Sequence, residues 1–145
     1  MKKVLSMATI ITMAAILVAC SCPKKEVRER NIKTVKKFFK LLEKENIKAF
    51  VDLYAKDGKQ INPYHSNLFP KEVKGKKALY AFWKNVPAMF DGMEYPIKEI
   101  MPLHDENKVL ITLTGKIKLK KGKGLYTNDY LCLFVFNKDG KIKEY

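Results

Sequence analysis

Four side chains that can form hydrogen bonds alternate along one segment near the C-terminus: Tyr126, Asn128, Tyr130 and Cys132. Alternate residues of a β-strand lie on the same face of its sheet, so this segment brings two phenols, an amide and a thiol together. A few such groups in an apolar surround are typical of a small-ligand site. The set contains no carboxylate and no imidazole, so it predicts binding rather than proton abstraction.

His65 is the candidate acid–base residue, because it lies in the polar loop 64–67 and imidazole titrates near neutral pH. The alternative is a solvated loop histidine without a role. The other histidine, His104, lies beside Asp105 near the end of a predicted strand. The sequence has no Cys-x-x-Cys, no His-x-x-x-His and no glycine-rich phosphate loop, so it predicts neither a metal site nor a cofactor.

The N-terminus has the parts of an export signal. Lys2 and Lys3 precede an uncharged apolar run over 4–18, and about 15 residues is short for a membrane-spanning helix. The run ends in Leu17-Val18-Ala19-Cys20, which resembles the lipobox of bacterial lipoproteins. The resemblance implies a signal peptide over 1–19, palmitate or a similar lipid on Cys20, and a protein held outside the cytoplasm on the cell membrane or outer membrane. The alternatives are a plain signal peptide or an uncleaved anchor.

The remaining chain is strongly basic. Its formal charge falls from +14 to +12 when Lys2 and Lys3 leave with the signal peptide. Arg28 and Arg30 are the only arginines among its many lysines, and without a nucleic-acid motif this composition predicts no nucleic-acid partner. Either the lysines form a solvated surface, or they attract anionic lipid headgroups. The polar segment 20–30 is expected to be a tether, followed by one domain over 31–145.

Helical periodicity predicts three helices. The first covers 31–45, and the second follows Asn46 as its N-cap and carries Tyr54 on its apolar face until Asp57-Gly58 stops it. The third helix starts near Gly75 and ends at Pro87. Strands are predicted over 59–63, 93–104, 108–120, 125–136 and 141–145. This order predicts an α+β fold, with three N-terminal helices packed on one face of a curved antiparallel sheet.

The order and spacing of several local motifs over 31–145 resemble the SnoaL-like branch of the nuclear-transport-factor-2-like superfamily. The resemblance implies a cone-shaped, cystatin-like roll with a pocket at its open end, and dimers that form through the sheet. The motifs are Asn46 with Leu53-Tyr54-Ala55-Lys56-Asp57, Asn62-Pro63, Val73-Lys74-Gly75-Lys76-Lys77-Ala78-Leu79, and Phe134-Val135-Phe136-Asn137-Lys138-Asp139-Gly140-Lys141-Ile142.

Ketosteroid isomerase, an enzyme of this superfamily, uses an Asp base and an oxyanion hole of Tyr and protonated Asp. By position, the resemblance places the base at Asn62, the tyrosine at Phe38 and the second acid at Cys132. None of these side chains can perform the corresponding role. The acid expected in phenazine-type relatives is Thr127. The resemblance also points the alternating face inward, so the expected ligand set is Phe38, Asn62, Trp83, Tyr126, Asn128, Tyr130 and Cys132.

Three functions are therefore open. The first, which the missing carboxylates favour, is a lipid-anchored module that binds a small apolar ligand without catalysis. The second is a cyclase or isomerase with His65 as its acid–base group. The third is a structural or interaction lipoprotein whose pocket is filled by its own side chains. The short final strand, 141–145, further predicts an open sheet edge, to be covered by residues beyond Tyr145 or by a partner chain.

Overall fold

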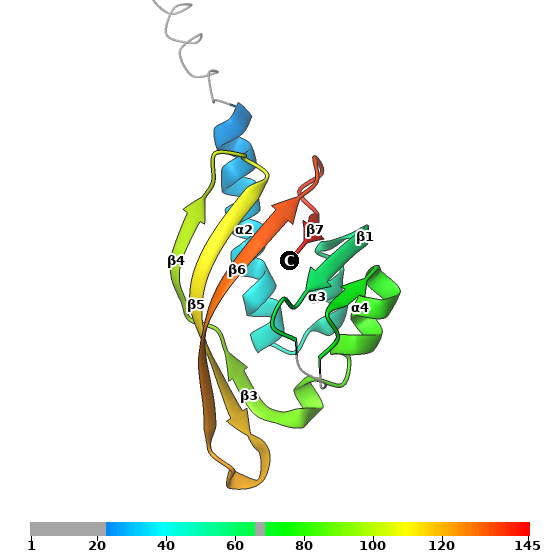
Figure 1. The fold of residues 1–145 in the computed structure, drawn as a ribbon, viewed down its shortest axis with the longest axis vertical. Coiled ribbons are helices and arrows are strands. Elements are labelled where there is room, and N and C mark those ends of the chain that lie inside the picture. The colour runs from blue at the N-terminus through cyan, green and yellow to red at the C-terminus, as the bar shows by residue number, and fades with distance from the viewer. Residues whose placement is uncertain (1–22, 66–68) are drawn as a thin grey trace, which may run out of the picture.

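The computed structural model describes residues 23–65 and 69–145. Helix α2 (Pro23–Glu43) runs along the molecule beside the sheet (Figure 1). Its buried side chains recur at helical spacing, and lysines occupy the opposite side. The buried apolar residues are Val35, Phe38, Phe39 and Leu42, and Asn31 is buried on the same helix. The predicted start at residue 31 was wrong, because the charged segment before it continues the helix and Pro23 suits a first helical position. Most of the predicted tether, 20–30, is therefore helical.

Helix α3 (Ile47–Val51) begins at the predicted cap, where the Asn46 side chain accepts a hydrogen bond from the Ala49 N–H at 3.2 Å. The helix is shorter than predicted. Strand β1 (Tyr54–Ile61) follows at once, so Tyr54 opens a strand and Asp57-Gly58 lie within it. Pairing with β7 (Ile142–Glu144), which comes from the other end of the chain, overrides the local helical pattern.

Helix α4 (Lys76–Trp83) starts after Gly75 as predicted, and Gly75 has a φ of 82° that suits glycine. The helix ends before Pro87, which instead opens the 3-10 helix η1 (Pro87–Met89). A short strand that the sequence did not reveal, β2 (Glu72–Lys74), pairs with β1.

The sheet has the strand order β2-β1-β7-β6-β5-β3, with β4 also paired to β5. The predicted strand over 93–104 is two strands, β3 (Phe90–Glu94) and β4 (Ile97–Pro102), because Tyr95-Pro96 interrupts it. The longest strands form the predicted hairpin of β5 (Lys108–Leu119) and β6 (Leu125–Phe136). The sheet is mixed rather than antiparallel throughout, since β7 runs parallel to β1.

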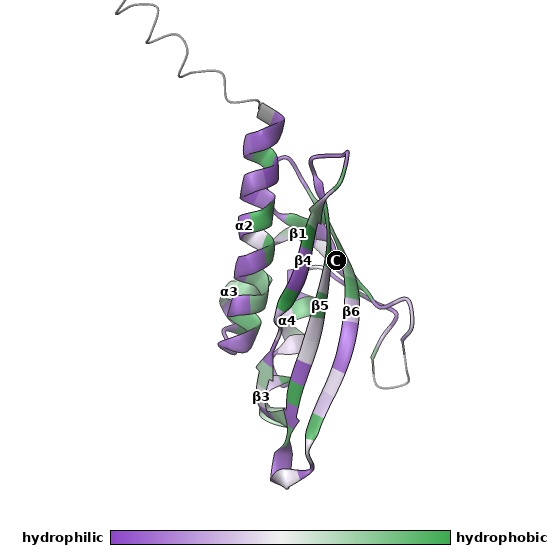
Figure 2. Cartoon of the chain, turned by 90° about the vertical axis from the view of Figure 1, so that its left-hand side faces the viewer, coloured by the Kyte–Doolittle hydropathy of each residue, from purple (hydrophilic) through white to green (hydrophobic). Residues whose placement is uncertain are grey.

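The helices pack on one face of the curved sheet, which confirms the predicted α+β cone (Figure 2). Strand β7 lies between β6 and β1, and the Tyr145 N–H donates to the Lys59 carbonyl at 3.0 Å. Strand β7 is registered against β6 only at Val135 and Phe136. Within the described part of the chain, the rest of that β6 edge has no strand partner.

Candidate functional site

Tyr126, Asn128 and Tyr130 lie on one face of β6, as their spacing predicts. This is the face that carries buried Cys132 and Phe134 farther along the strand. Toward the hairpin turn the cover of helices ends, so Tyr126 is 46% exposed while Tyr130 is half-buried. The three polar side chains therefore stand at the open end of the cone rather than inside it.

These side chains influence one another. Burial raises the pKa of Tyr130, the hydrogen bond with Asn128 lowers it, and the hydrogen bond with Tyr126 raises it. Tyr95 lies close by: burial raises the pKa of its phenol, and Tyr130 and Glu43 add to the rise. Both phenols are therefore protonated at neutral pH. The Tyr95 hydroxyl donates to the Met93 Sδ at 3.5 Å, which leaves the Tyr130 hydroxyl as the candidate donor to a ligand.

The open end contains little that could serve as a base. Asp129 alternates to the opposite face of β6, where it accepts hydrogen bonds from Lys98 and Thr114 at 2.8 and 2.6 Å. These two contacts lower the pKa of Asp129. The carboxylate that raises the pKa of Tyr95 belongs to Glu43. Its Oε1 accepts a hydrogen bond from the Tyr95 backbone N–H at 2.8 Å. The sequence did not single out Tyr95 or Glu43, because neither belongs to the alternating pattern.

Phe38 and Cys132 lie deeper, in the core. Phe38 is fully buried, and the Cys132 Sγ lies 3.6 Å from the Tyr145 hydroxyl. Burial raises the pKa of Cys132, so the thiol is not activated. Aromatic rings fill the space around Phe38, with centroids 4.6 to 6.1 Å from its own; they are Phe39, Phe50, Tyr54, Phe134 and Tyr145.

Tyr54 is the unexpected member of this aromatic cluster. Its side chain is fully buried, and its hydroxyl has no hydrogen-bond partner within the described residues. Burial raises its pKa well above the ordinary value, as it does for Tyr145 next to it. The interior thus holds a protonated phenol with an unused donor. The helical pattern around Tyr54 hid this residue from the sequence analysis.

Asn62 and Trp83 belong to a separate chain of hydrogen bonds. The Trp83 Nε1–H donates to Gln60 Oε1 at 2.9 Å, and Gln60 Nε2 donates to Asn62 Oδ1 at 3.1 Å. Asn62 Nδ2 then donates to the Pro70 carbonyl at 2.8 Å. Both ends of the Asn62 amide are occupied, so this side chain fixes the path of the loop rather than facing a ligand. The sequence analysis did not predict a role for Gln60, which is buried at the centre of this chain of hydrogen bonds.

The seven predicted ligand residues therefore separate into three places: the open end, the aromatic core and the Trp83–Gln60–Asn62 chain of hydrogen bonds.

His65 is exposed and makes no hydrogen bond or ion pair with the described residues. Cys20 lies outside the described residues. Among the residues described, no group of three or more His, Cys, Asp or Glu side chains could hold a metal ion. The described helices include none long and apolar enough to cross a membrane.

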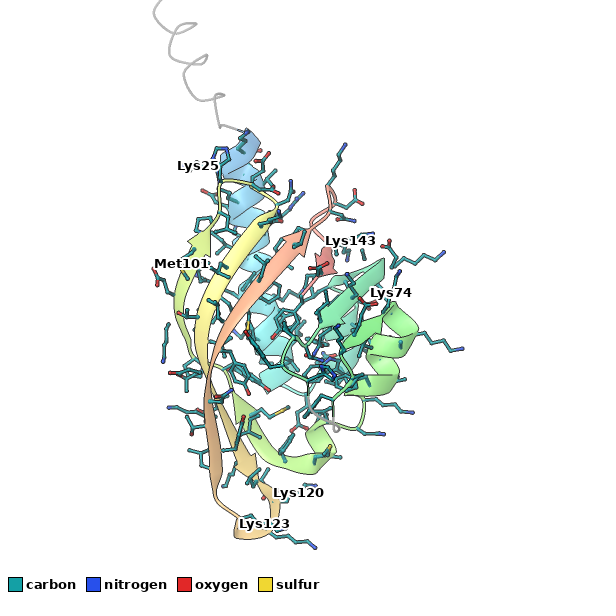
Figure 3. All side chains as sticks on the ribbon, in the orientation of Figure 1. Lys25, Lys74, Met101, Lys120, Lys123 and Lys143 are labelled. Carbon is teal, nitrogen blue, oxygen red and sulfur yellow. The ribbon has the colours of Figure 1, made fainter. Side chains whose placement is uncertain are left out.

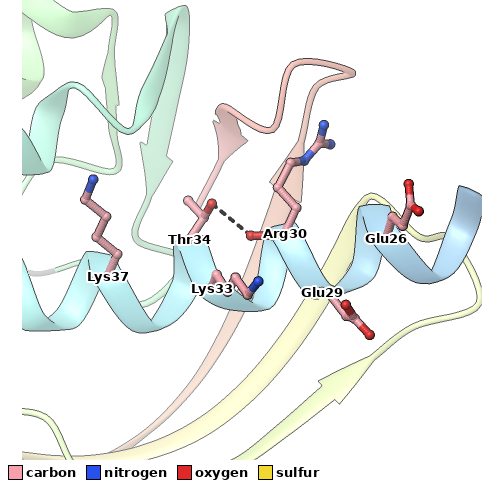
Figure 4. Close-up of a pocket in the computed structure, with 6 residues that line it drawn as sticks. All are labelled: Glu26, Glu29, Arg30, Lys33, Thr34 and Lys37. Atoms are coloured by element: carbon pink, nitrogen blue, oxygen red, sulfur yellow. Dashed lines mark hydrogen bonds between the residues drawn. The ribbon is translucent and has the colours of Figure 1, made fainter. Parts of the chain in front are cut away.

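Two hollows in the surface lie away from all these residues. One, of about 420 Å³, follows α2 and is lined by charged side chains together with Thr34, whose hydroxyl donates to the Arg30 carbonyl at 3.1 Å (Figure 4). The other, of about 660 Å³, lies between α3, α4, η1 and β3 and reaches Lys120 at the hairpin turn. Neither is lined mainly by apolar residues, as a small-ligand pocket usually is.

Helices on one face of a curved sheet, with polar groups at the open end, define a cone-shaped α+β domain. The model of the SnoaL-like domain matches residues 35–145, and the chain belongs to this family. No curated protein sequence matches it. Among solved structures, it is similar to a phenazine biosynthesis-related protein from Pseudomonas aeruginosa. The two are 23% identical with a TM-score of 0.69, over 83% of this chain and 79% of that one.

Two other similar structures differ in their chemistry. The epoxide hydrolase/cyclase-like enzyme SalBIII, from pyran ring formation in salinomycin, is 13% identical with a TM-score of 0.68, over 80% of this chain and 87% of that one. A computationally designed 17-OHP binder is 18% identical with a TM-score of 0.67, over 78% and 86%. At such identities the likeness shows a shared fold, on which both enzymes and binding proteins are built.

Proposed function

We propose that this protein is a lipid-anchored module that binds a small ligand at the open end of the cone without converting it. The observation that carries the proposal is the group of Tyr126, Asn128 and Tyr130, which offers hydrogen bonds on a partly apolar face and holds no carboxylate. The computationally designed 17-OHP binder on the same fold supports the idea that this scaffold can bind without catalysis.

The surroundings of the three residues indicate the class of ligand. Met93 and Ile117 are cross-strand partners beside them, and the Tyr95 and Tyr130 rings add flat apolar surface. A flat, apolar or aromatic molecule with one or two oxygen atoms suits this combination, because rings cover its face and the polar groups orient it. The filled core around Phe38 keeps such a ligand at the rim.

The test begins with native mass spectrometry of the purified protein for a co-purified small molecule, followed by titration with steroid-like and aromatic ketones. Tyr126→Phe combined with Asn128→Leu is expected to weaken binding at least tenfold. Tyr80→Phe is the control, because Tyr80 is equally exposed but lies on α4. Unchanged affinity in the double variant contradicts the proposed site and favours a domain with no ligand.

Catalysis is tested separately with steroid-enone and polyketide-like substrates. We expect no turnover by the unaltered protein. Turnover that Asn62→Asp alone creates would support the loss of an ancestral base at this position. Turnover by the unaltered protein that disappears in His65→Ala would instead establish the cyclase or isomerase alternative.

The anchor is tested at Cys20. If this residue carries the lipid, metabolic fatty-acid labelling is lost in Cys20→Ala, and the protein remains unprocessed or leaves the membrane fraction. Labelling of Cys20→Ala at the level of the unaltered protein contradicts the anchor.

A homodimer through the sheet is the partner that we propose. On the face of β6 opposite the helices, Leu131 is 69% and Leu133 is 40% exposed, which leaves a water-facing apolar patch. Sedimentation in detergent is expected to give a dimer, and Leu131→Lys is expected to give a monomer. A monomer before any substitution contradicts this arrangement.

A further inference from the structure

The far end of the β5–β6 hairpin is strongly basic, because five of the eight residues 116–123 are lysine. It extends beyond the helices, at the opposite end of the molecule from the start of α2 (Figure 1). Residues 116–126 contain no acidic side chain. Their lysines are Lys116, Lys118, Lys120, Lys121 and Lys123.

These five lysines have no ionic partner among the described residues. The salt bridges of the structure involve lysines elsewhere, such as Lys59, Lys98 and Lys143. Glu94 is the cross-strand partner of Lys116, and Asp91 lines the same hollow as Lys120, yet neither pair forms a salt bridge. Figure 3 shows Lys120 and Lys123 directed outward at the turn. The hairpin end therefore presents concentrated, unneutralised positive charge.

Large apolar side chains are exposed beside this charge. Leu125 is 61% exposed on β6, and Tyr126 next to it is 46% exposed. Met89, which is 59% exposed, directly precedes Phe90, the cross-strand partner of Leu119. Exposed leucine, methionine and tyrosine among lysines are the combination that interfacial membrane segments use, since lysines meet headgroups while apolar groups enter the boundary below them.

We propose that the hairpin end, residues 116–126 with Met89, docks on an anionic lipid bilayer. Charge alone would suit any polyanion, but exposed aliphatic side chains gain nothing from a purely hydrophilic one. The hairpin contains no arginine, which nucleic-acid sites favour for phosphate recognition. The docking surface shares Tyr126 and Ile117 with the proposed ligand site, and otherwise uses the turn, Leu125, Met89 and the lysine-bearing face.

Docking of the hairpin end would set the orientation of the molecule relative to the bilayer. The start of α2 and the hairpin turn are at opposite ends of its long axis (Figure 1). A chain held on a membrane before α2 and also at the hairpin would therefore lie with its long axis along the bilayer. If Cys20 carries the proposed lipid, hairpin docking adds a second membrane attachment to it.

The test places a fluorescent reporter at the hairpin of the full chain. The Leu125→Trp variant is reconstituted into vesicles of phosphatidylcholine alone, or of equal parts phosphatidylcholine and phosphatidylglycerol. The spectrum of the parent chain, which contains Trp83, is subtracted. In the anionic vesicles the new emission should shift to the blue and resist acrylamide quenching. High salt should reverse both effects.

Two sets of substitutions are compared in the reporter chain. Changing Lys116, Lys118, Lys120, Lys121 and Lys123 to Gln should abolish the shift. The matched control changes Lys33, Lys36, Lys37 and Lys40 of α2, together with Lys44 directly after it, to Gln, and should retain the shift. Equal emission in both kinds of vesicle overturns the proposal, as does loss of the shift in the α2 control. A shift of the same size when heparin or single-stranded DNA is added to neutral vesicles would assign the hairpin to soluble polyanions instead.

Discussion

The ring of Tyr130 lies over Gly115 on the neighbouring strand, so closely that a Cβ at position 115 would be 2.7 Å from the ring. The missing side chain of Gly115 therefore makes room for a phenol of the proposed ligand site. A β-strand glycine covered by a cross-strand aromatic ring is a recurrent way to recover packing that glycine gives up.

Gly115→Ala is expected to displace the Tyr130 ring and weaken ligand binding. The free energy of unfolding should fall by only about 1 kcal/mol, because the half-buried ring can swing outward. Gly58→Ala is the comparison. There a Cβ would lie 2.6 Å from the Ile142 carbonyl and 3.1 Å from the Ala55 carbonyl, and backbone cannot move aside as a ring can. We expect a loss near 3 kcal/mol for Gly58→Ala. Urea unfolding of both variants checks the order, and equal losses would contradict it.

Tyr54→Phe is expected to stabilise the free protein by roughly 1 kcal/mol, because it removes a buried hydroxyl without a partner. Tyr145→Phe should instead be neutral or destabilising, since that hydroxyl contacts the Cys132 thiol. Thermal unfolding of the two single variants measures the contrast. A loss of stability in Tyr54→Phe would show that the hydroxyl has a bound partner in solution.

Alkaline pH is expected to destabilise the fold through its buried phenols. Burial raises the pKa of Tyr54 and Tyr145 above the ordinary value of 10.0, so the unfolded chain releases these protons first. Stability should be steady below about pH 9 and fall above pH 10, by up to about 1.4 kcal/mol per pH unit for each phenol. Unfolding between pH 8 and 11 measures this, and each Tyr→Phe variant should reduce the slope. Tyr64→Phe, at a fully exposed residue, should leave it unchanged.

Asn62→Asp is expected to lower stability by about 1 kcal/mol, because a carboxylate cannot donate to the Pro70 carbonyl. Gln60→Glu should cost more, since it removes a donor from a buried position and introduces a charge there. Urea unfolding near neutral pH compares the two. A larger loss for Asn62→Asp would contradict the order of burial along this chain of hydrogen bonds.

The alternation of residues predicted the β5–β6 hairpin well, because its long period-two pattern has no competing interpretation. Tyr54 was misassigned, since Phe50, Val51 and Tyr54 share a helical face in sequence, while the pairing that makes Tyr54 a strand residue involves Ile142. A contact between residues so far apart leaves no mark in local periodicity. For the same reason, the sequence could not show that Tyr145 reaches the core.

The positions of the candidate residues were predicted in part. The spacing of Tyr126, Asn128 and Tyr130 correctly predicted that they share one face of β6, because this depends only on the alternation of residues along a strand. It could not indicate where along β6 the helices cease to cover that face, which separates these residues from buried Cys132. Asn62 was placed at a pocket by resemblance. Its role in the structure depends on Gln60 and Pro70, and both contacts follow from how the loop folds back.

The parallel pairing of β7 with β1 has a consequence for the timing of folding. The strands β2 and β1 join the rest of the sheet only through β7, so they stay separate from it until residues 142–144 are in place. Closing so large a loop is slow compared with forming a helix or a hairpin. Such a delay would leave the facing edges of β1 and β6 unpaired until late in folding.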